Sequence, residues 1–231
     1  MIKIGIIGCG WLGKALYNRL SQNYIVECFN RDTTTNNSTF WQNDIIIISI
    51  NTKNNYIPTL KKIKKLSSKN IILCSSISTY REFSGNVDEN SIITKKSIQK
   101  EAEEIFPNAL ILRLGGLMGY DRVAGRWKNN NKFTDGEVNY IHRDDVINII
   151  ELSIQKNIKN EIFNLVAPQH PLRSSVHQKN SQKFGFKLGT FDGNISRVIS
   201  SQKIIDKLGY IFKYPNPLEF WENIDIINNH K

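Results

Sequence analysis

The sequence has few cysteines and no cluster of metal-binding side chains. Only three of its 231 residues are cysteines, and Cys9, Cys28 and Cys74 stand far apart, each in or next to a segment with the pattern of a buried strand. An odd number without metal-ligand spacing is typical of free, buried thiols in a reducing compartment. The four histidines form no ligand group with them, so we expect no structural metal.

Long apolar runs are also missing. Ile45–Ile48 is among the longest, far below the roughly 20 residues that a helix needs to cross a bilayer. The N-terminus enters a strand pattern at Ile2 and lacks the basic and then apolar layout of a signal peptide. We therefore expect a cytoplasmic protein with no membrane partner. Its 40% of hydrophobic residues suffice for a full core.

Acidic side chains are outnumbered, 21 against 31 lysines and arginines, which gives a net charge of +10. The basic residues are scattered, and the densest group, Lys61 to Lys65, fits the solvated face of an amphipathic helix. A nucleic-acid partner is therefore not expected. A basic surface equally suits a cofactor and a substrate that carry phosphate groups.

The first half of the chain alternates between apolar, β-branched segments and helical patterns. Strands are expected at 2–7, 24–29, 44–50, 70–74 and 109–114, and helices from the glycine turn to about residue 20, at 56–66 and at 94–106. Repeated strand–helix–strand units predict an α/β fold with a Rossmann-type, doubly wound parallel sheet.

The pattern changes after Gly116. Residues 119–139 are rich in glycine, asparagine and charge, and they are expected to form a long loop over the cleft. A helix at 144–153, a strand at 161–166 and short helices at 174–184 and 200–208 follow. We expect an NAD(P)-binding domain over 1–166 and a small C-terminal substrate-binding lobe over 167–231, interleaved with it.

The segment GCGWLG at 8–13 follows a buried strand and opens a helix, which is the context of a dinucleotide-binding turn. Gly8 permits the tight turn, Gly10 lets the backbone approach the pyrophosphate, and Gly13 lets helix and strand pack closely. Trp11 and Leu12 place the helix N-terminus against the phosphate charge. The sequence therefore predicts a nicotinamide dinucleotide as cofactor.

The second strand leads into Asn30, Arg31 and Asp32, where the residue that holds the adenine ribose is expected. A guanidinium suits a 2′-phosphate through charge-assisted hydrogen bonds. Arg31 and Asn30 therefore favour NADP over NAD. The alternative is that Asp32 holds the ribose of NAD while Arg31 faces solvent.

Taken together, GCGWLG at 8–13, CSSISTY at 74–80, ILRLGGLMG at 111–119 and NYIHRDDV at 139–146 resemble the short-chain dehydrogenase/reductase superfamily, most closely its extended, NAD-dependent epimerase/dehydratase branch. The segment 207–210, KLGY, resembles the turn near the end of that branch. The form of the first motif is more similar to the atypical, YeeZ-like bacterial members. The resemblance covers nearly the whole chain.

The resemblance implies roles for strand-end residues. Ser76 would hydrogen-bond the carbonyl or hydroxyl of the substrate, and Tyr80 would line its pocket. The alternatives are that Ser76 binds its own backbone and that Tyr80 only packs. The residues expected to line the cofactor beyond the turn are Ser49, Ser75, Gly115 and Gly116.

The family's reactive pair is a tyrosine with a lysine four residues later, and the tyrosine is missing here. The helix that should carry them reads TKKSIQK at 94–100. Lys100 is four residues beyond Lys96 and could keep the lysine's role on the nicotinamide ribose, or both could lie on a solvated helix face. Ser97 cannot replace the tyrosine, because the pKa of an alcohol is too high.

Other polar groups are candidates for the site. His142 could titrate near neutral pH, although in the family its position mainly fixes the loop and the helix start. In the family that the sequence resembles, the position of Arg113 more often orients structure than reacts. Arg122, Arg126 and Lys128 would suit an anionic substrate or form an exposed basic loop, and His170 has no readable role.

Two functions follow from these motifs. The first is an NAD(P)-dependent oxidoreductase or epimerase that acts on a small polar substrate, such as a sugar or nucleotide sugar. The second is an NADP(H)-binding redox sensor or scaffold without dehydrogenase activity. The resemblance is also compatible with a homodimer.

Overall fold

The chain folds into two units in a computed structural model that describes residues 1–29, 39–53, 55–67, 69–127 and 132–222. The first unit comprises Met1–Glu82, Glu89–Leu114 and Ile147–Asn164, and the second comprises Phe83–Asp88, Gly115–Val146 and Leu165–Lys231. Each unit is therefore assembled from three separate stretches of sequence.

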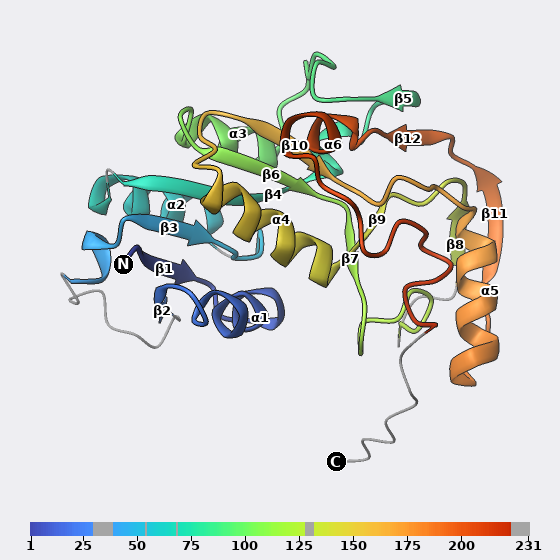
Figure 1. Cartoon of the computed structure of the whole chain (residues 1–231). Helices are drawn as coiled ribbons and strands as arrows, with labels where there is room; N and C mark the ends of the chain where they lie inside the picture. Colours follow the sequence, from blue (N-terminus) through green and yellow to red (C-terminus); the bar gives the residue numbers. More distant parts are fainter. Residues whose placement is uncertain (30–38, 54, 68, 128–131, 223–231) are drawn as a thin grey trace. The chain divides into compact units, whose positions relative to one another are not determined.

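A six-stranded sheet with the order β10-β6-β4-β3-β1-β2 forms the middle of the first unit (Figure 1). Its strands are β1 (Lys3–Ile7), β2 (Ile25–Phe29), β3 (Ile45–Ile48), β4 (Asn70–Ser76), β6 (Leu110–Leu114) and β10 (Ile162–Leu165). β1 pairs in parallel with β2 and β3, β3 with β4, and β4 with β6. Ile46, Ile47 and Ile48 are fully buried, as a central parallel strand requires. The predicted Rossmann-type sheet is confirmed.

Helices cover both faces of this sheet. They are α1 (Trp11–Leu20), α2 (Tyr56–Leu66), α3 (Ile98–Ile105) and residues 147–155 of α4 (Arg143–Gln155). α2 and α3 share one apolar core with the sheet, and α1 and α4 lie on the opposite face (Figure 1). Arg19 of α1 donates to Glu151 of α4, with Nε 2.7 Å from Oε2, and so ties those two helices together.

The second unit is built from short strand pairs. β5 (Gly85–Val87) pairs with β12 (Arg197–Ile199), β7 (Gly116–Met118) with β9 (Tyr140–His142), and β8 (Lys132–Asp135) with β11 (Thr190–Asn194). Helices α5 (Arg173–Phe184) and α6 (Gln202–Leu208) complete it. Its core includes Met118, Val176, Phe220 and Trp221.

The expectation of one long loop at 119–139 is wrong for Lys132–Asp135, which forms β8. This strand is four residues long, and its partner β11 lies far along the chain, so no local periodicity reveals it. The expected helix at 94–106 also begins later, at Ile98, because Ser97 caps it. None of the helices within the described residues is long and apolar enough to cross a bilayer.

Candidate cofactor and substrate sites

The turn after β1 is closed by contacts that only glycine permits. Gly8 has a φ of +97°, and a Cβ there would lie 2.4 Å from the Ser49 carbonyl oxygen. A Cβ at Gly13 would lie 2.1 Å from the Gly8 carbonyl oxygen. A Cβ at Gly10, by contrast, would meet nothing within 4 Å. The fold therefore needs Gly8 and Gly13, whereas Gly10 faces open space.

The turn is held against both neighbouring strands. The Gly8 N–H donates to the Phe29 carbonyl at 3.0 Å, and the Ser49 N–H donates to the Ile7 carbonyl at 2.8 Å. Helix α1 then begins at Trp11 with Gly10 as its N-cap, and no acidic residue lies in its first turn. The positive end of the helix dipole is therefore not neutralised by a carboxylate of its own first turn.

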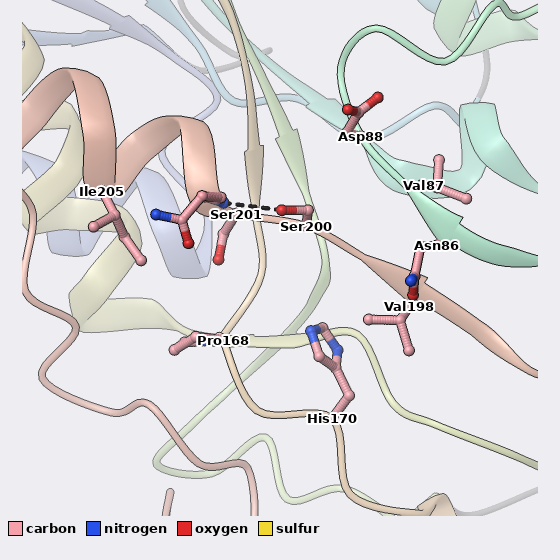
Figure 2. A pocket seen from close by; sticks show the side chains of 10 residues that line it. Asn86, Val87, Asp88, Pro168, His170, Val198, Ser200, Ser201 and Ile205 are labelled. Atoms are coloured by element: carbon pink, nitrogen blue, oxygen red, sulfur yellow. Dashed lines mark hydrogen bonds between the residues drawn. The ribbon is translucent and has the colours of Figure 1, made fainter.

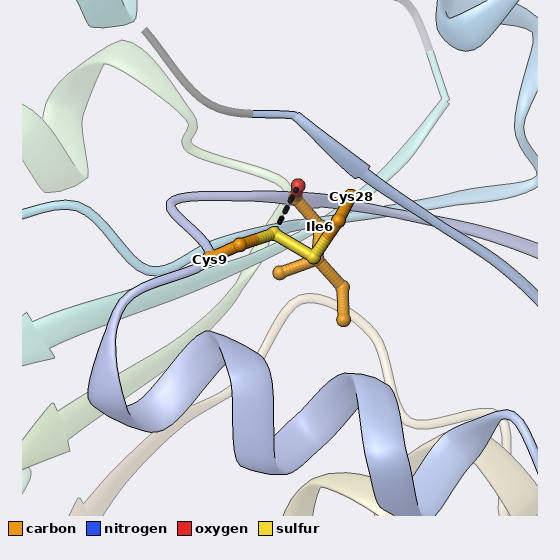
Figure 3. Close-up of a disulfide and its surroundings, with 3 residues drawn as sticks. All are labelled: Ile6, Cys9 and Cys28. Atoms are coloured by element: carbon orange, nitrogen blue, oxygen red, sulfur yellow. Dashed lines mark hydrogen bonds between the residues drawn. A yellow bond between two sulfur atoms is a disulfide. The ribbon is translucent and has the colours of Figure 1, made fainter.

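A disulfide joins the turn to β2. Cys9 and Cys28 are bonded, with their Cα atoms 6.0 Å apart (Figure 3). The expectation of three free, buried thiols is thus wrong, and only Cys74 is a buried free cysteine in the described part of the chain. Sequence spacing could not reveal the pair, because it depends on the parallel register that aligns Ile6 with Cys28.

Side chains at the end of β4 are engaged within the first unit. The Ser75 hydroxyl donates to Glu103 Oε1 at 2.7 Å. Ser76 caps a short 3₁₀ helix, η2 (Ile77–Tyr80), because its Oγ accepts the Ser78 N–H at 3.2 Å. Ser76 remains partly exposed. The backbone role expected as its alternative is present, and its substrate role stays a prediction.

A buried ion pair lies beside this strand end. Arg113 donates to both carboxylate oxygens of Glu103, Nε to Oε1 at 3.0 Å and Nη2 to Oε2 at 2.7 Å. Arg113 also donates to the Tyr80 hydroxyl, which in turn donates to Asn164 Oδ1 at 3.1 Å. Tyr80 is fully buried, and burial raises its pKa despite the nearby guanidinium. These hydrogen bonds hold the Arg113 guanidinium and the Tyr80 hydroxyl in place, and the role of Tyr80 in a substrate pocket stays a prediction.

His142 lies in the core of the second unit. Its ring is 1% exposed and stacks on Tyr214, with the ring centroids 3.7 Å apart. Nδ1 accepts the Asp144 N–H at 3.2 Å, and Nε2 faces Gly119, where a Cβ would lie 2.5 Å away. Burial lowers the pKa of His142 to about 4. We therefore do not expect His142 to titrate near neutral pH.

The stability of the second unit is expected to fall as the pH drops from about 6.5 toward 4. Burial also lowers the pKa of His177 to about 4, whereas an unfolded histidine titrates near pH 6.5. Below pH 6.5 the unfolded chain binds protons that the folded chain does not, so acid favours unfolding. Thermal unfolding midpoints measured between pH 7.5 and 4.5 test this.

The His142→Phe variant provides the comparison for that pH series, because phenylalanine keeps a ring against Tyr214 but cannot titrate. Its midpoint should depend less steeply on pH than that of the parent protein. Equal slopes for the two proteins would show that His142 does not contribute to the acid sensitivity.

Gly115 and Gly116 are also explained by packing. The Gly115 N–H donates to the Leu165 carbonyl, and the Gly116 N–H donates to the Asn139 carbonyl, both at 2.9 Å. A Cβ at Gly115 would lie 2.4 Å from the Asn139 carbonyl oxygen, and one at Gly116 would lie 2.5 Å from the Tyr140 ring. The backbone of the second unit requires both glycines, and their approach to a nicotinamide stays a prediction.

The second unit also contains a cavity of about 410 Å³ (Figure 2). Its polar lining includes Asn86, Asp88, His170 and Ser200. His170 Nδ1 lies 3.0 Å from the Val138 carbonyl oxygen, so it carries the proton and leaves Nε2 as an acceptor. Burial lowers the pKa of His170, which favours this neutral form. The sequence offered no signal for this role of His170.

Comparisons with known proteins agree with this architecture. No family model matches the chain. YeeZ of Escherichia coli K12 is 32% identical over 163 residues, which cover 64% of this chain and only 60% of YeeZ. A putative NAD-dependent epimerase/dehydratase from Methylobacillus flagellatus has a TM-score of 0.74 at 18% identity and covers 96% of both chains. The human epimerase family protein SDR39U1, solved with NADPH, has a TM-score of 0.75 at 14% identity. The alignment covers 96% of this chain and 100% of the SDR39U1 chain.

The chain is therefore similar in sequence to part of YeeZ, and its fold is similar to that of solved proteins of the epimerase family. A third similar structure, UDP-glucuronic acid 4-epimerase from Bacillus cereus in complex with NAD, has a TM-score of 0.74 at 16% identity and covers 95% of both chains.

Helix α3 carries no tyrosine. Ser97 is the N-cap of that helix, and its Oγ accepts the Lys100 N–H at 3.1 Å. The Lys100 side chain is 35% exposed, with Nζ 3.9 Å from Glu104. Ser97 is thus a capping residue, whereas the Lys100 side chain is partly exposed.

Several of the residues predicted for the site remain as sequence predictions. Asn30, Arg31 and Lys128 lie outside the described residues, so the structure says nothing about the NADP preference. Arg122 and Arg126 are exposed in the second unit. Within the described residues no three histidine, cysteine or acidic side chains gather as metal ligands.

Proposed function

We propose that this chain binds a nicotinamide dinucleotide at residues 8–13 and acts as an NAD(P)-dependent oxidoreductase or epimerase on a small polar substrate. One observation carries the proposal. Gly8 and Gly13 are needed by the fold, but Gly10 has free space where a side chain would stand. A glycine at such a position is explained by the close approach of a ligand. The pyrophosphate of a dinucleotide fits there, at the N-terminus of α1.

The residues proposed to hold the cofactor are those of the turn and of the neighbouring strand ends. Main-chain groups of Gly10, Trp11 and Leu12 would face the pyrophosphate, and Ser49 would border it. Asn30 and Arg31 would favour NADP through the 2′-phosphate. When bound, the nicotinamide supplies or accepts a hydride.

The substrate is proposed to be hydroxyl-rich, such as a sugar or a nucleotide sugar. The structural relatives that bear such names support this choice, among them UDP-glucuronic acid 4-epimerase. The polar cavity of the second unit supports it as well, because Asp88 and His170 Nε2 can accept hydrogen bonds from hydroxyl groups. The volume of that cavity is within the usual range for small-molecule sites.

The deciding experiment combines binding with turnover. Calorimetry with NADPH, NADH and their oxidised forms measures which dinucleotide binds. Turnover with a panel of sugars, nucleotide sugars and ketones then tests catalysis. If no dinucleotide binds the reduced protein, the proposed function is wrong.

A second function, an NADP(H)-dependent sensor or scaffold, is favoured by the absent tyrosine on α3. The buried Tyr80 hydroxyl is engaged by Arg113 and Asn164, so it is not available as a proton donor to a substrate. Tight binding of NADPH without turnover of any compound in the panel would support this alternative.

Lys100 is expected to contact the nicotinamide ribose, whereas Lys96 is not. The Lys100→Met variant should bind the preferred dinucleotide about tenfold more weakly, because a charged hydrogen bond is lost. Lys96→Met, an exposed position just before the same helix, serves as the matched control and should bind normally. Equal affinities of both variants and the parent protein would place Lys100 on a solvated helix face instead.

A further inference from the structure

We propose that Cys9 and Cys28 form a reversible thiol–disulfide pair that sets the affinity of the glycine turn for its cofactor. The site would react with low-molecular-weight thiols and disulfides of the glutathione class. This inference rests on the proposed function, because it assumes that the turn binds a dinucleotide.

The position of the pair is its first support. Cys9 stands between Gly8 and Gly10, and Cys28 is the penultimate residue of β2 (Ile25–Phe29). The disulfide therefore closes a loop of sequence separation 19 that contains all of α1. In dinucleotide-binding folds the pyrophosphate lies at this turn and the adenine ribose lies at the end of the second strand. The cross-link joins those two points.

The accessibility of the two sulfur atoms is the second support. Cys28 is exposed and Cys9 is partly buried, so a thiolate in solution can reach the bond. Cys74 differs, because it is buried and burial raises its pKa to about 12. Of these three cysteines, only Cys9 and Cys28 lie where thiol chemistry can reach them.

The backbone around Cys9 can also accommodate the reduced pair. Cys9 Sγ lies 3.7 Å from the carbonyl oxygen of Ile6 (Figure 3). A disulfide sulfur carries no proton, but a thiol at this position can donate to that carbonyl. The same backbone therefore accommodates both the bonded pair and the two thiols.

The exchange is a two-electron reaction. A thiolate from one glutathione attacks a sulfur of the pair, the S–S bond breaks, and the released cysteine thiolate takes up a proton. A second glutathione resolves the mixed disulfide. The protein gains two thiols and two electrons, and one molecule of oxidised glutathione forms.

Oxidation is expected to weaken cofactor binding. The cross-link fixes the turn to β2. It also places two bonded sulfur atoms between the positions proposed to bind the pyrophosphate and the ribose. Free thiols allow the turn and the strand end to adjust separately to the ligand. Couplings between two such events are commonly 5- to 150-fold, and we expect the oxidised chain to bind about tenfold more weakly.

The test titrates the full chain with NADPH and with NADH by calorimetry, once in excess reduced glutathione and once after oxidation by oxidised glutathione. Alkylation and mass spectrometry report the state of the pair in each sample. The Cys28→Ser variant should bind equally in both buffers, and Cys74→Ser should respond as the parent protein does. By linkage, a tenfold coupling also makes the pair about 30 mV easier to reduce when the dinucleotide is saturating.

The outcomes separate the two proposals. Equal binding by the oxidised and reduced chains, tighter binding by the oxidised chain, or failure of the pair to oxidise would each overturn the thiol–disulfide proposal and leave cofactor binding intact. If neither dinucleotide binds the fully reduced parent or the Cys28→Ser variant, the proposed function itself fails.

Discussion

The Glu103→Gln variant is expected to lose about 3–5 kcal/mol of unfolding free energy, because it leaves a buried charge without its partner. The Arg113 and Glu103 side chains are only 3% and 4% exposed. Burial alone would lower the pKa of Arg113, but its hydrogen bonds and ion pair with Glu103 outweigh burial and raise it. Glutamine removes the negative charge and turns an amide toward the guanidinium. Chemical denaturation followed by circular dichroism measures the loss.

Glu104 offers a matched control on the next residue of α3. Its side chain is 64% exposed, and its ion pair with Lys100 spans 3.9 Å. A solvated pair of this kind contributes about 1 kcal/mol or less, so Glu104→Gln should be nearly neutral. If both variants lose the same small amount, Glu103 and Arg113 do not form the dry, bidentate pair described above.

The Gly10→Ala variant is expected to fold normally and to bind the dinucleotide about 100-fold more weakly. The added methyl group meets no protein atom within 4 Å, so the fold has no reason to lose stability. The same methyl group would keep the pyrophosphate from the backbone of the turn. Losing about two charge-assisted hydrogen bonds corresponds to roughly this factor. Calorimetry measures the affinity, and thermal unfolding checks the fold.

Gly13→Ala provides the contrast. Its Cβ would lie 2.1 Å from the Gly8 carbonyl oxygen, so this variant should lose stability whether or not a cofactor is present. A Gly10→Ala protein that binds as tightly as the parent would show that Gly10 faces no ligand. The two variants together separate a glycine that serves folding from one that serves binding.

The sequence was sufficient to predict those parts of the fold and the site that depend on a few neighbouring residues. The isoleucines of β3 identify a buried parallel strand by themselves, and Gly8, Gly10 and Gly13 identify the turn between β1 and α1. Backbone sterics act over a few residues, so this information is contained in short segments.

The remaining features of the site could not be predicted, because they depend on which distant segments of the chain come together. The sequence left open whether Tyr80 lines a pocket or only packs, because its hydrogen-bond partners Asn164 and Arg113 lie 84 and 33 positions away. Cys9 and Cys28 pair only through the register of β1 and β2. For the same reason His142 could not be recognised as a core residue, since the rings of Tyr214 and Phe220 that surround it come from near the end of the chain.

The pairing of β5 with β12 has a consequence for synthesis on the ribosome. Arg197 lies opposite Gly85, so 197 − 85 = 112 positions separate the two strands. At usual elongation rates of the ribosome, about 6 to 22 s pass between the synthesis of β5 and the synthesis of β12. During that interval an unpaired edge is open to other chains. A premature stop before β12 would leave it open permanently, and such truncated chains should be found with chaperones or in aggregates.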